Sequence, residues 1–242
     1  MIKFFRKIRQ NLLMENKTSK YFKYAIGEIV LVVIGILIAL QINTWNEHQK
    51  AIKKETEAIN SLKQEIISNI EKLEGVLTLN ETYLIETDSI LDLLNRDLKE
   101  LPASKIARLF DYESIVFDIP ELDNIIELNS ELLIKRKELI SEFRELKFTF
   151  NREKESQSFL NEFWSSKVTS FFISCGIYLI PNNNKENILT IHEMTNNGYS
   201  LKQLTALINA KQGLQKVWRR DQQITLEKSK EVLKLLNNPS ND

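Results

Sequence analysis

The longest run of hydrophobic positions lies near the beginning of the chain. The 22 residues from Tyr24 to Trp45 contain one charged side chain, Glu28, and ten of the twelve residues from Ile29 to Leu40 are aliphatic. A helix of this length spans about 33 Å, which matches a hydrocarbon core of about 30 Å. The aliphatic side chains outweigh the cost of one acid placed off centre. We therefore expect a transmembrane helix over residues 24–45.

A cleaved signal peptide and the core helix of a soluble protein are the alternatives for this segment. A signal peptide ends in small residues at its cleavage site, whereas this run ends in Leu40-Gln41-Ile42-Asn43-Thr44-Trp45. Bulky groups stand where the small residues of a cleavage site are required. We favour an uncleaved anchor over both alternatives.

Beyond Trp45 the apolar positions recur every seven residues. Steps of seven from Ile52 reach Ile59, Ile66, Leu73, Asn80, Thr87 and Leu94, and a companion series contains Leu62, Val76, Tyr83 and Ile90. This heptad pattern predicts a coiled-coil-like helix that packs along one side and ends near Leu94. Asn80 interrupts the apolar series, and it either fixes the register of packing or is a tolerated polar residue.

Helical spacing of apolar residues returns from about 130 to 167 and from 200 to about 236, with Ser200 as a plausible N-cap. Residues 111–126 indicate a loop followed by a short helix. The apolar run at 168–181 is too short to span a membrane, and we expect a buried hairpin or an inserted helix end there. The predicted fold class is all-α: an N-terminal single transmembrane helix continues into a coiled-coil-like, antiparallel helical bundle.

Composition favours long helices, and the distribution of charge predicts how the chain is oriented in the membrane. Only six Gly and four Pro occur in 242 residues, which favours long helices. Residues 1–23 carry seven cations against Glu15 alone, so the positive-inside rule places the N-terminus in the cytoplasm and the body outside. Ile2, Phe5, Ile8 and Leu12 form one stripe, which indicates either an amphipathic helix on the inner leaflet or a disordered basic tail.

Four parts of the chain follow from these patterns. Residues 1–23 form a basic amphipathic cytoplasmic segment, 24–45 the transmembrane helix, 46–100 a juxtamembrane coiled-coil-like helix, and 101–242 the rest of the helical bundle. The expected partner is the lipid bilayer, because residues 24–45 form an apolar span. The body after the span has a small excess of acids, so we expect no nucleic-acid partner.

Small and polar residues share one face of the expected transmembrane helix. Candidates for assembly in the membrane are Gly27, Glu28, Gly35, Ala39 and Asn43. Gly35 and Ala39 form a small-xxx-small pair, which lets a second helix approach closely. Glu28 either reaches the inner interface or pairs with a partner or its own copy. Tyr24 and Trp45 are expected as anchors at the two interfaces.

Candidate catalytic chemistry is missing from the sequence. His48 and His192 lie far apart and outside any metal-ligand spacing, Cys175 is the only cysteine, and six scattered glycines supply no phosphate-binding loop. Trp218-Arg219-Arg220 suggests an anion-binding cluster, although a polar helix face explains it as well. We predict no catalytic residue, no cofactor and no metal site, and hence no enzyme.

The N-terminal block MIKFFRKIRQNLLMENKTSKYFKYAIGEIVLVVIGILIALQINTWNE resembles a widespread family of small single-pass bacterial membrane proteins that is known only as a domain of unknown function. The similarity includes Gly27-Glu28, Gly35, Gln41, Asn43 and Trp45-Asn46-Glu47, and over 48–242 it is only general. The resemblance implies the inner membrane of a Gram-negative bacterium, with the body in the periplasm, and no assigned activity.

Two functions are compatible with these expectations. The first is a non-enzymatic protein-interaction or scaffold module, which forms a homo-oligomer or binds another membrane protein. The alternative is a periplasmic small-molecule sensor that acts through a membrane partner, because helical bundles bind ligands between their helices. A hydrolase or metalloenzyme requires a site that the sequence does not contain.

Overall fold

The chain divides into two compact units, Met1–Thr56 and Glu57–Asp242. The computed structural model describes residues 18–94, 96, 100–102, 115, 117–128, 137–174, 188–190 and 201–237. The first helix, α2 (Thr18–Leu94), runs without interruption and contributes residues to both units. Within the described residues the first unit consists of this helix alone, whereas the second is a packed helical body.

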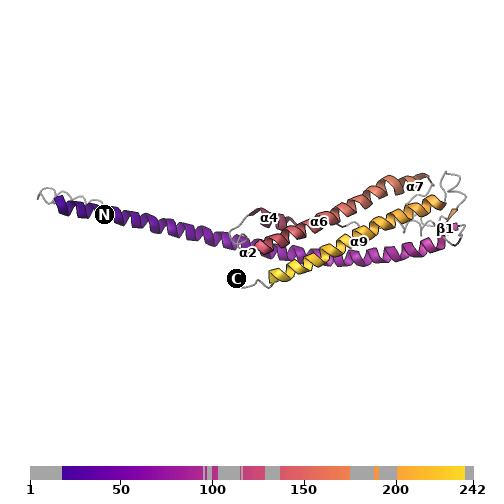
Figure 1. Cartoon of the computed structure of the whole chain (residues 1–242), viewed down its shortest axis with the longest axis horizontal. Helices are drawn as coiled ribbons and strands as arrows, with labels where there is room; N and C mark the ends of the chain where they lie inside the picture. Colours follow the sequence, from indigo (N-terminus) through magenta and orange to yellow (C-terminus); the bar gives the residue numbers. More distant parts are fainter. Residues whose placement is uncertain are drawn as a thin grey trace. The chain divides into compact units, whose positions relative to one another are not determined.

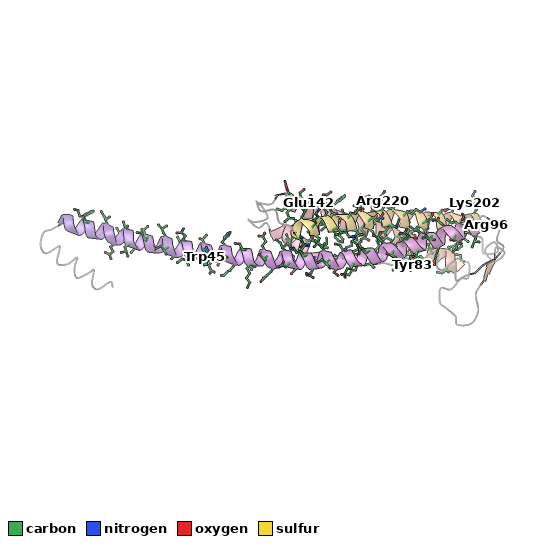
Figure 2. All side chains as sticks on the ribbon, turned by 90° about the horizontal axis from the view of Figure 1, so that it is seen from below. Trp45, Tyr83, Arg96, Glu142, Lys202 and Arg220 are labelled. Carbon is green, nitrogen blue, oxygen red and sulfur yellow. The ribbon has the colours of Figure 1, made fainter. Side chains whose placement is uncertain are left out.

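The described part of the first unit exposes its apolar side chains. The large aliphatic residues between Ile26 and Ile42 are 47–72 % exposed, and they surround the helix on the way to Trp45 (Figure 2). Among the described residues, α2 alone is long and apolar enough to cross a membrane, and none of its most apolar window is buried. The expectation of a long apolar N-terminal helix is confirmed, and this segment is not a core helix of the fold.

Three long helices lie side by side in the second unit (Figure 1): the α2 residues from Glu57 onward, α6 (Lys137–Phe163) and α9 (Leu201–Asn237). A short helix, α4 (Pro120–Leu128), packs beside α6. A π-helical turn, η1 (Trp164–Val168), joins α6 to α7 (Thr169–Ser174). Hydrogen bonds pair Asn80 with Gln222 and Asp88 with Gln212, so α2 and α9 are antiparallel.

Two three-residue strands are the exception to helical structure in the described body. β1 (Glu100–Pro102) pairs antiparallel with β2 (Ile188–Thr190), with Leu101 opposite Leu189. The predicted all-α class is confirmed, since every other regular element is a helix.

The helix boundaries agree with the sequence pattern. The first helix ends at Leu94 as expected, the short helix after Pro120 is α4, and the last helix covers 201–237. The expected helix over 130–167 is described from Lys137 and changes to the π-helical turn at Trp164. The predicted stripe in residues 1–17, Cys175 and His192 lie outside the described residues.

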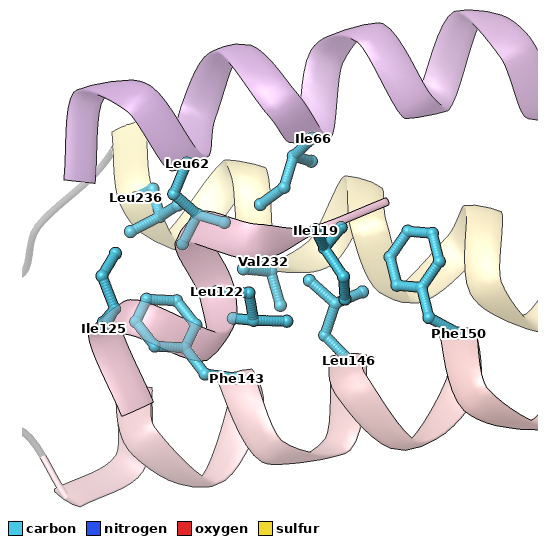
Figure 3. Packing of buried hydrophobic residues seen from close by; sticks show 10 residues of the cluster. All are labelled: Leu62, Ile66, Ile119, Leu122, Ile125, Phe143, Leu146, Phe150, Val232 and Leu236. Carbon is cyan, nitrogen blue, oxygen red and sulfur yellow. The ribbon is translucent and has the colours of Figure 1, made fainter. Parts of the chain in front are cut away.

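The largest apolar cluster of the body fills one end of the bundle (Figure 3). Side chains from four helices and the turn before α4 meet there: Leu62, Ile66, Ile119, Leu122, Ile125, Phe143, Leu146, Phe150, Val232 and Leu236. Glu65 of α2 accepts a hydrogen bond from the backbone N–H of Glu121 (3.3 Å), and Asn69 donates to the carbonyl of Asp118 (3.1 Å). These bonds hold the first turn of α4, where Pro120 fits because that position needs no N–H donor.

The heptad positions of α2 face the interior of the body. Ile66, Leu73, Asn80 and Thr87 are 0 % exposed and Leu94 is 4 % exposed. A second apolar cluster, which contains Ile90, Leu94, Val168, Phe171, Leu204 and Ile208, fills the other end of the bundle. The heptad face is therefore buried as predicted, and two of its central positions are polar.

Candidate functional site

The middle of the body has a polar interior. Seven buried side chains from three helices form what we call the polar layer: Asn80 of α2, Glu153 and Ser156 of α6, and Gln215, Trp218, Asp221 and Gln222 of α9. Only a small apolar group of Val76, Leu160 and Trp218 is buried at the same level. Buried polar groups cost free energy unless they are hydrogen-bonded, so the contacts within the layer decide its role.

Asn80 connects α2 to α9. Its Nδ2 donates to Gln222 Oε1 at 3.1 Å, and Gln215 Nε2 donates to its Oδ1 at 3.3 Å. All three side chains are 0 % exposed. The alternative that Asn80 fixes the register is thus the one with structural support, because a shift of α2 by one heptad would place Leu73 or Thr87 against the two glutamines.

Glu153 is the buried carboxylate of the layer that faces Trp218. The indole Nε1 of Trp218 donates to Glu153 Oε1 at 2.7 Å, and the glutamate is 2 % exposed. Burial raises the pKa of Glu153 to about 7, because the low dielectric of the interior disfavours the charged form. The hydrogen bond from Trp218 and the side chain of Gln222 oppose this rise, while the negative charge of Asp221 adds to it.

Asp221 is the second buried carboxylate, and it joins α9 to α6. Ser156 Oγ donates to Asp221 Oδ2 at 2.5 Å, and Arg152 Nη2 lies 2.9 Å from Oδ1. Arg220 approaches the same oxygen at 3.4 Å. Asp221 is 2 % exposed, so the two arginines supply the compensating charge that a buried carboxylate requires.

Small hydroxyl residues let α6 and α9 approach each other more closely than either approaches α2. Thr225 Oγ1 donates to the backbone carbonyl of Thr149 in α6 at 3.1 Å. Long side chains instead connect α2 to α9: Arg219 Nη2 contacts Glu81 at 2.9 Å, and Lys230 Nζ contacts Glu74 at 2.6 Å. The body is thus a tight α6–α9 pair, and α2 is attached to it by apolar contacts at both ends and by extended polar contacts between them.

The transmembrane assembly candidates are distributed over the surface of the exposed part of α2. Gly27, Gly35, Ala39 and Asn43 are exposed, and Glu28 is partly buried. A Cβ added at either glycine has no atom within 4 Å, so that face is open to a neighbouring helix. The side chain of Tyr24 lies outside the described part, and Trp45 is 64 % exposed. Their roles remain predictions.

The side chains of Trp218, Arg219 and Arg220 do not come together in one site in the fold. Trp218 is fully buried against Glu153, Arg219 pairs with Glu81, and Arg220 approaches Asp221. The three side chains therefore have separate partners, as expected for successive positions around a helix. Within the described residues, no group of His, Cys, Asp or Glu side chains has a geometry that could hold a metal ion.

Sequence reasoning missed most of the polar layer. Asn80 stands out in the sequence because it interrupts an apolar series, but its partners Gln215 and Gln222 are separated from it by 135 and 142 residues. A signal does exist in α9, where the buried positions Gln215, Asp221 and Gln222 fall among apolar positions of the same helix face. Only the packed structure shows that these residues meet Glu153.

Comparison with known families gives one match. The model of a family of unknown function, DUF6090, matches residues 28–113. This segment covers about a third of the chain and includes most of the apolar segment and the whole heptad face of α2. The expectation of a domain family of unknown function is supported over this segment. Comparisons with curated proteins and with solved structures give no match.

Proposed function

We propose that this protein is a non-enzymatic, membrane-anchored assembly protein whose helical body binds a second copy of itself or another membrane protein. The observation that carries this proposal is the continuity of α2. One helix contains both the exposed apolar segment and the buried heptad face of the body. An apolar segment with such exposure is stable in a bilayer, where all backbone groups of a helix are satisfied internally.

The chemistry of the polar layer supports a non-enzymatic role. Its two carboxylates are engaged by the fold itself, Glu153 by Trp218 and Asp221 by Ser156 and Arg152. Both are 2 % exposed, which leaves them out of reach of a substrate at the surface. A layer of this kind is suited to holding helices in register.

The proposed topology places the N-terminus in the cytoplasm and the body in the periplasm of a Gram-negative bacterium. Its basis is the excess of cations before the apolar segment, together with the resemblance of the N-terminal block. Protease added to spheroplasts is expected to remove a C-terminal tag and leave an N-terminal tag on a protected fragment.

Two controls make this topology experiment decisive. A cytoplasmic marker protein must survive, and both tags must be lost after the membrane is permeabilised. Survival of the C-terminal tag on intact spheroplasts, with loss of a periplasmic marker, contradicts the proposed orientation.

Assembly in the membrane is expected to depend on Gly35. Leucine at this position blocks close approach of a second helix on the open face of Gly27 and Gly35. We expect Gly35→Leu to reduce crosslinked species in native membranes roughly three- to tenfold, which corresponds to the usual strength of such contacts. Crosslinking and gel electrophoresis measure the change.

Val33 provides the matched control for Gly35. It lies about 160° away around the same helix, and it is exposed as well. Val33→Leu is expected to leave the crosslinked species unchanged. Equal effects of the two substitutions, or only monomer in the unaltered protein, contradict assembly through the glycine face.

The body also exposes apolar side chains on α6 and on α9 that are suited to contact with a protein partner. Phe148 and Phe159 of α6 are 63 % and 59 % exposed, and eleven residues, about three helical turns, separate them on one side of the helix. On α9, Val217 and Ile224 are 42 % and 36 % exposed and are two turns apart. Exposed aromatic side chains of this kind are typical of interaction surfaces.

A further inference from the structure

Exposed apolar residues of α6 and α9 lie on the side of this pair that faces away from α2. On α9, Ile224 is two positions, or about 200° around the helix, from Gln222, which bonds to Asn80 of α2. On α6, Phe148 is equally far from Phe150, which is buried in the apolar cluster that contains residues of α2. Both exposed side chains therefore point away from α2.

Two ion pairs join α6 and α9 along this side. Arg152 Nη2 lies 2.9 Å from Asp221 Oδ1, and Lys228 Nζ lies 2.6 Å from Glu145 Oε2. Each exposed apolar residue lies three, four or seven positions from one of these charged groups, which places it on the same side of its helix. These residues form one surface, which we call the outer face: Phe148 and Phe159 of α6, and Val217, Ile224 and Leu235 of α9.

The ion pairs also show which residues of the two helices are at the same height. Phe148 and Ile224 each lie between the two pairs, so they are level with each other. Phe159 is two helical turns from the arginine–aspartate pair along α6, and Gly213 is just over two turns from it along α9, in the same direction because the helices are antiparallel. Gly213 is exposed, and a Cβ added there has no atom within 4 Å. Phe159 is thus level with an open position on α9.

We propose that the outer face binds the outer face of a second copy, so that α6 of each copy contacts α9 of the other. This contact rests on the proposed function, in which both copies are anchored in one bilayer. Each copy carries its apolar segment on α2, so the α2 helices of the two copies point the same way. Outer faces that meet in this orientation are related by a two-fold axis parallel to the helices, which places α6 over α9 and keeps every residue at its height.

Apolar side chains of the two copies fit each other in this arrangement. Phe148 of one copy meets Ile224 of the other, and Phe159 meets the open position at Gly213, with Val217 about one turn away. The two α6 and two α9 helices then form a four-helix bundle in which all neighbouring helices are antiparallel, as in up-down-up-down bundles. The charges within the face need no new partner, because the ion pairs between α6 and α9 already satisfy them inside each copy.

Exposed charges beside the outer face are complementary in the same arrangement. Arg144 of α6 is within about two residues of the height of Glu227 of α9, and Glu155 is equally close to the height of Arg220. Each acid thus meets a base of the other copy. Contact of α6 with the α6 of the other copy in the same orientation would instead bring Arg144 against Arg144 and Glu155 against Glu155, and like charges oppose association.

Disulfide formation between copies in native membranes tests this arrangement. Every variant first carries Cys175→Ser, because Cys175 is the single cysteine of the chain. One copy then carries Ser141→Cys, and a differently tagged copy carries Glu231→Cys, at exposed positions that are level on α6 and α9. Oxidation with copper–phenanthroline is expected to link the two tags in one species.

Glu71→Cys replaces Glu231→Cys in the matched control. Glu71 is an exposed glutamate on α2. It is nearly level with Glu231, because the ion pair between Glu74 and Lys230 aligns the two helices. We expect roughly tenfold less of the linked species, since Cα atoms more than about 7 Å apart are not bridged without movement of the backbone.

Charge reversal tests the contact of α6 with α9. Arg144→Glu in the copy with Ser141→Cys is expected to reduce the linked species about two- to fivefold, and Glu227→Arg in the other copy is expected to restore it. Lys154→Glu is the matched control, since Lys154 is exposed on the opposite side of α6, two positions from Arg152. This variant is expected to leave the linkage unchanged.

The outcomes separate this interface from the proposed function. If a bifunctional amine-reactive crosslinker shows dimers but the two thiols stay unlinked, the outer face is not the interface, while assembly in the membrane stands. Monomer alone with that reagent contradicts both. Equal linkage of Glu231→Cys and Glu71→Cys, or linkage that Arg144→Glu leaves unchanged, also overturns the arrangement.

Discussion

Replacing Phe143 with alanine is expected to lower the free energy of unfolding of the full chain by about 3–5 kcal/mol. Phe143 is 0 % exposed and lies in the cluster where α4, α6 and α9 meet, beside Leu122 and Ile125 (Figure 3). Loss of the ring removes its buried apolar surface and leaves a cavity between rigid helices. Urea unfolding in detergent micelles, followed by circular dichroism, measures the loss.

Phe148 of the same helix provides the matched control. It is 63 % exposed, so Phe148→Ala is expected to change the free energy of unfolding by less than about 0.5 kcal/mol. A comparable loss of stability in the two variants contradicts the position of α6 in the bundle. If Phe148 contacts a protein partner as proposed, its removal reduces crosslinking of the body without loss of stability.

The second large effect is a change in the stability of the folded chain with pH. Glu153 has a pKa of about 7 in the folded protein and an ordinary value near 4.5, so between these values the folded chain holds a proton that the unfolded chain has released. The contribution of Glu153 to stability is therefore complete below about pH 4.5. This contribution is lost as the pH rises through about 7. A rise in pKa of this size corresponds to at most roughly 3 kcal/mol.

Glu153→Gln is expected to remove this part of the pH dependence. The variant has no proton to lose, so above pH 7 it is expected to be more stable than the unaltered protein by up to roughly 3 kcal/mol. Urea unfolding at a series of pH values measures the difference. The matched control is Glu155→Gln, an exposed position in the same helix, which is expected to leave the pH profile unchanged.

If the free energy of unfolding of the unaltered protein does not change with pH, the burial of an ionisable Glu153 is contradicted. The same conclusion follows from a Glu153→Gln variant that is less stable than the unaltered protein at pH 8. The comparison with the glutamine variant carries the conclusion, because every other ionisable group is common to the two proteins.

The extents of the long helices could be predicted because their signals are local. The end of α2 at Leu94 and the range of α9 follow from spacing of apolar residues within each segment. The π-helical turn at Trp164 had no such signal, because a single wide turn barely changes the spacing of apolar residues. Local patterns thus predict the long helices but not an irregular turn such as the one at Trp164.

The candidate site was predictable only in part, because its residues interact between helices. The heptad pattern identified Asn80 as an unusual position, yet nothing in that pattern connects it to Gln222 in α9. The rotation of α9 about its own axis decides that Trp218 is buried against Glu153 while Arg219 reaches Glu81 at the surface. Trp218, Arg219 and Arg220 are neighbours in the sequence, whereas packing gives each of them a different partner.

The sequence by itself determined that the chain is helical, that residues 24–45 are too apolar and too long for an ordinary surface helix, and which face of α2 packs against the body. Each of these properties depends on hydrophobicity and on the helical period, which neighbouring residues share. Tertiary structure alone decided that the centre of the bundle is polar and that Glu153 is buried in it. Hydrogen bonds between helices and the loss of solvent around a carboxyl group exist only once distant segments are packed together.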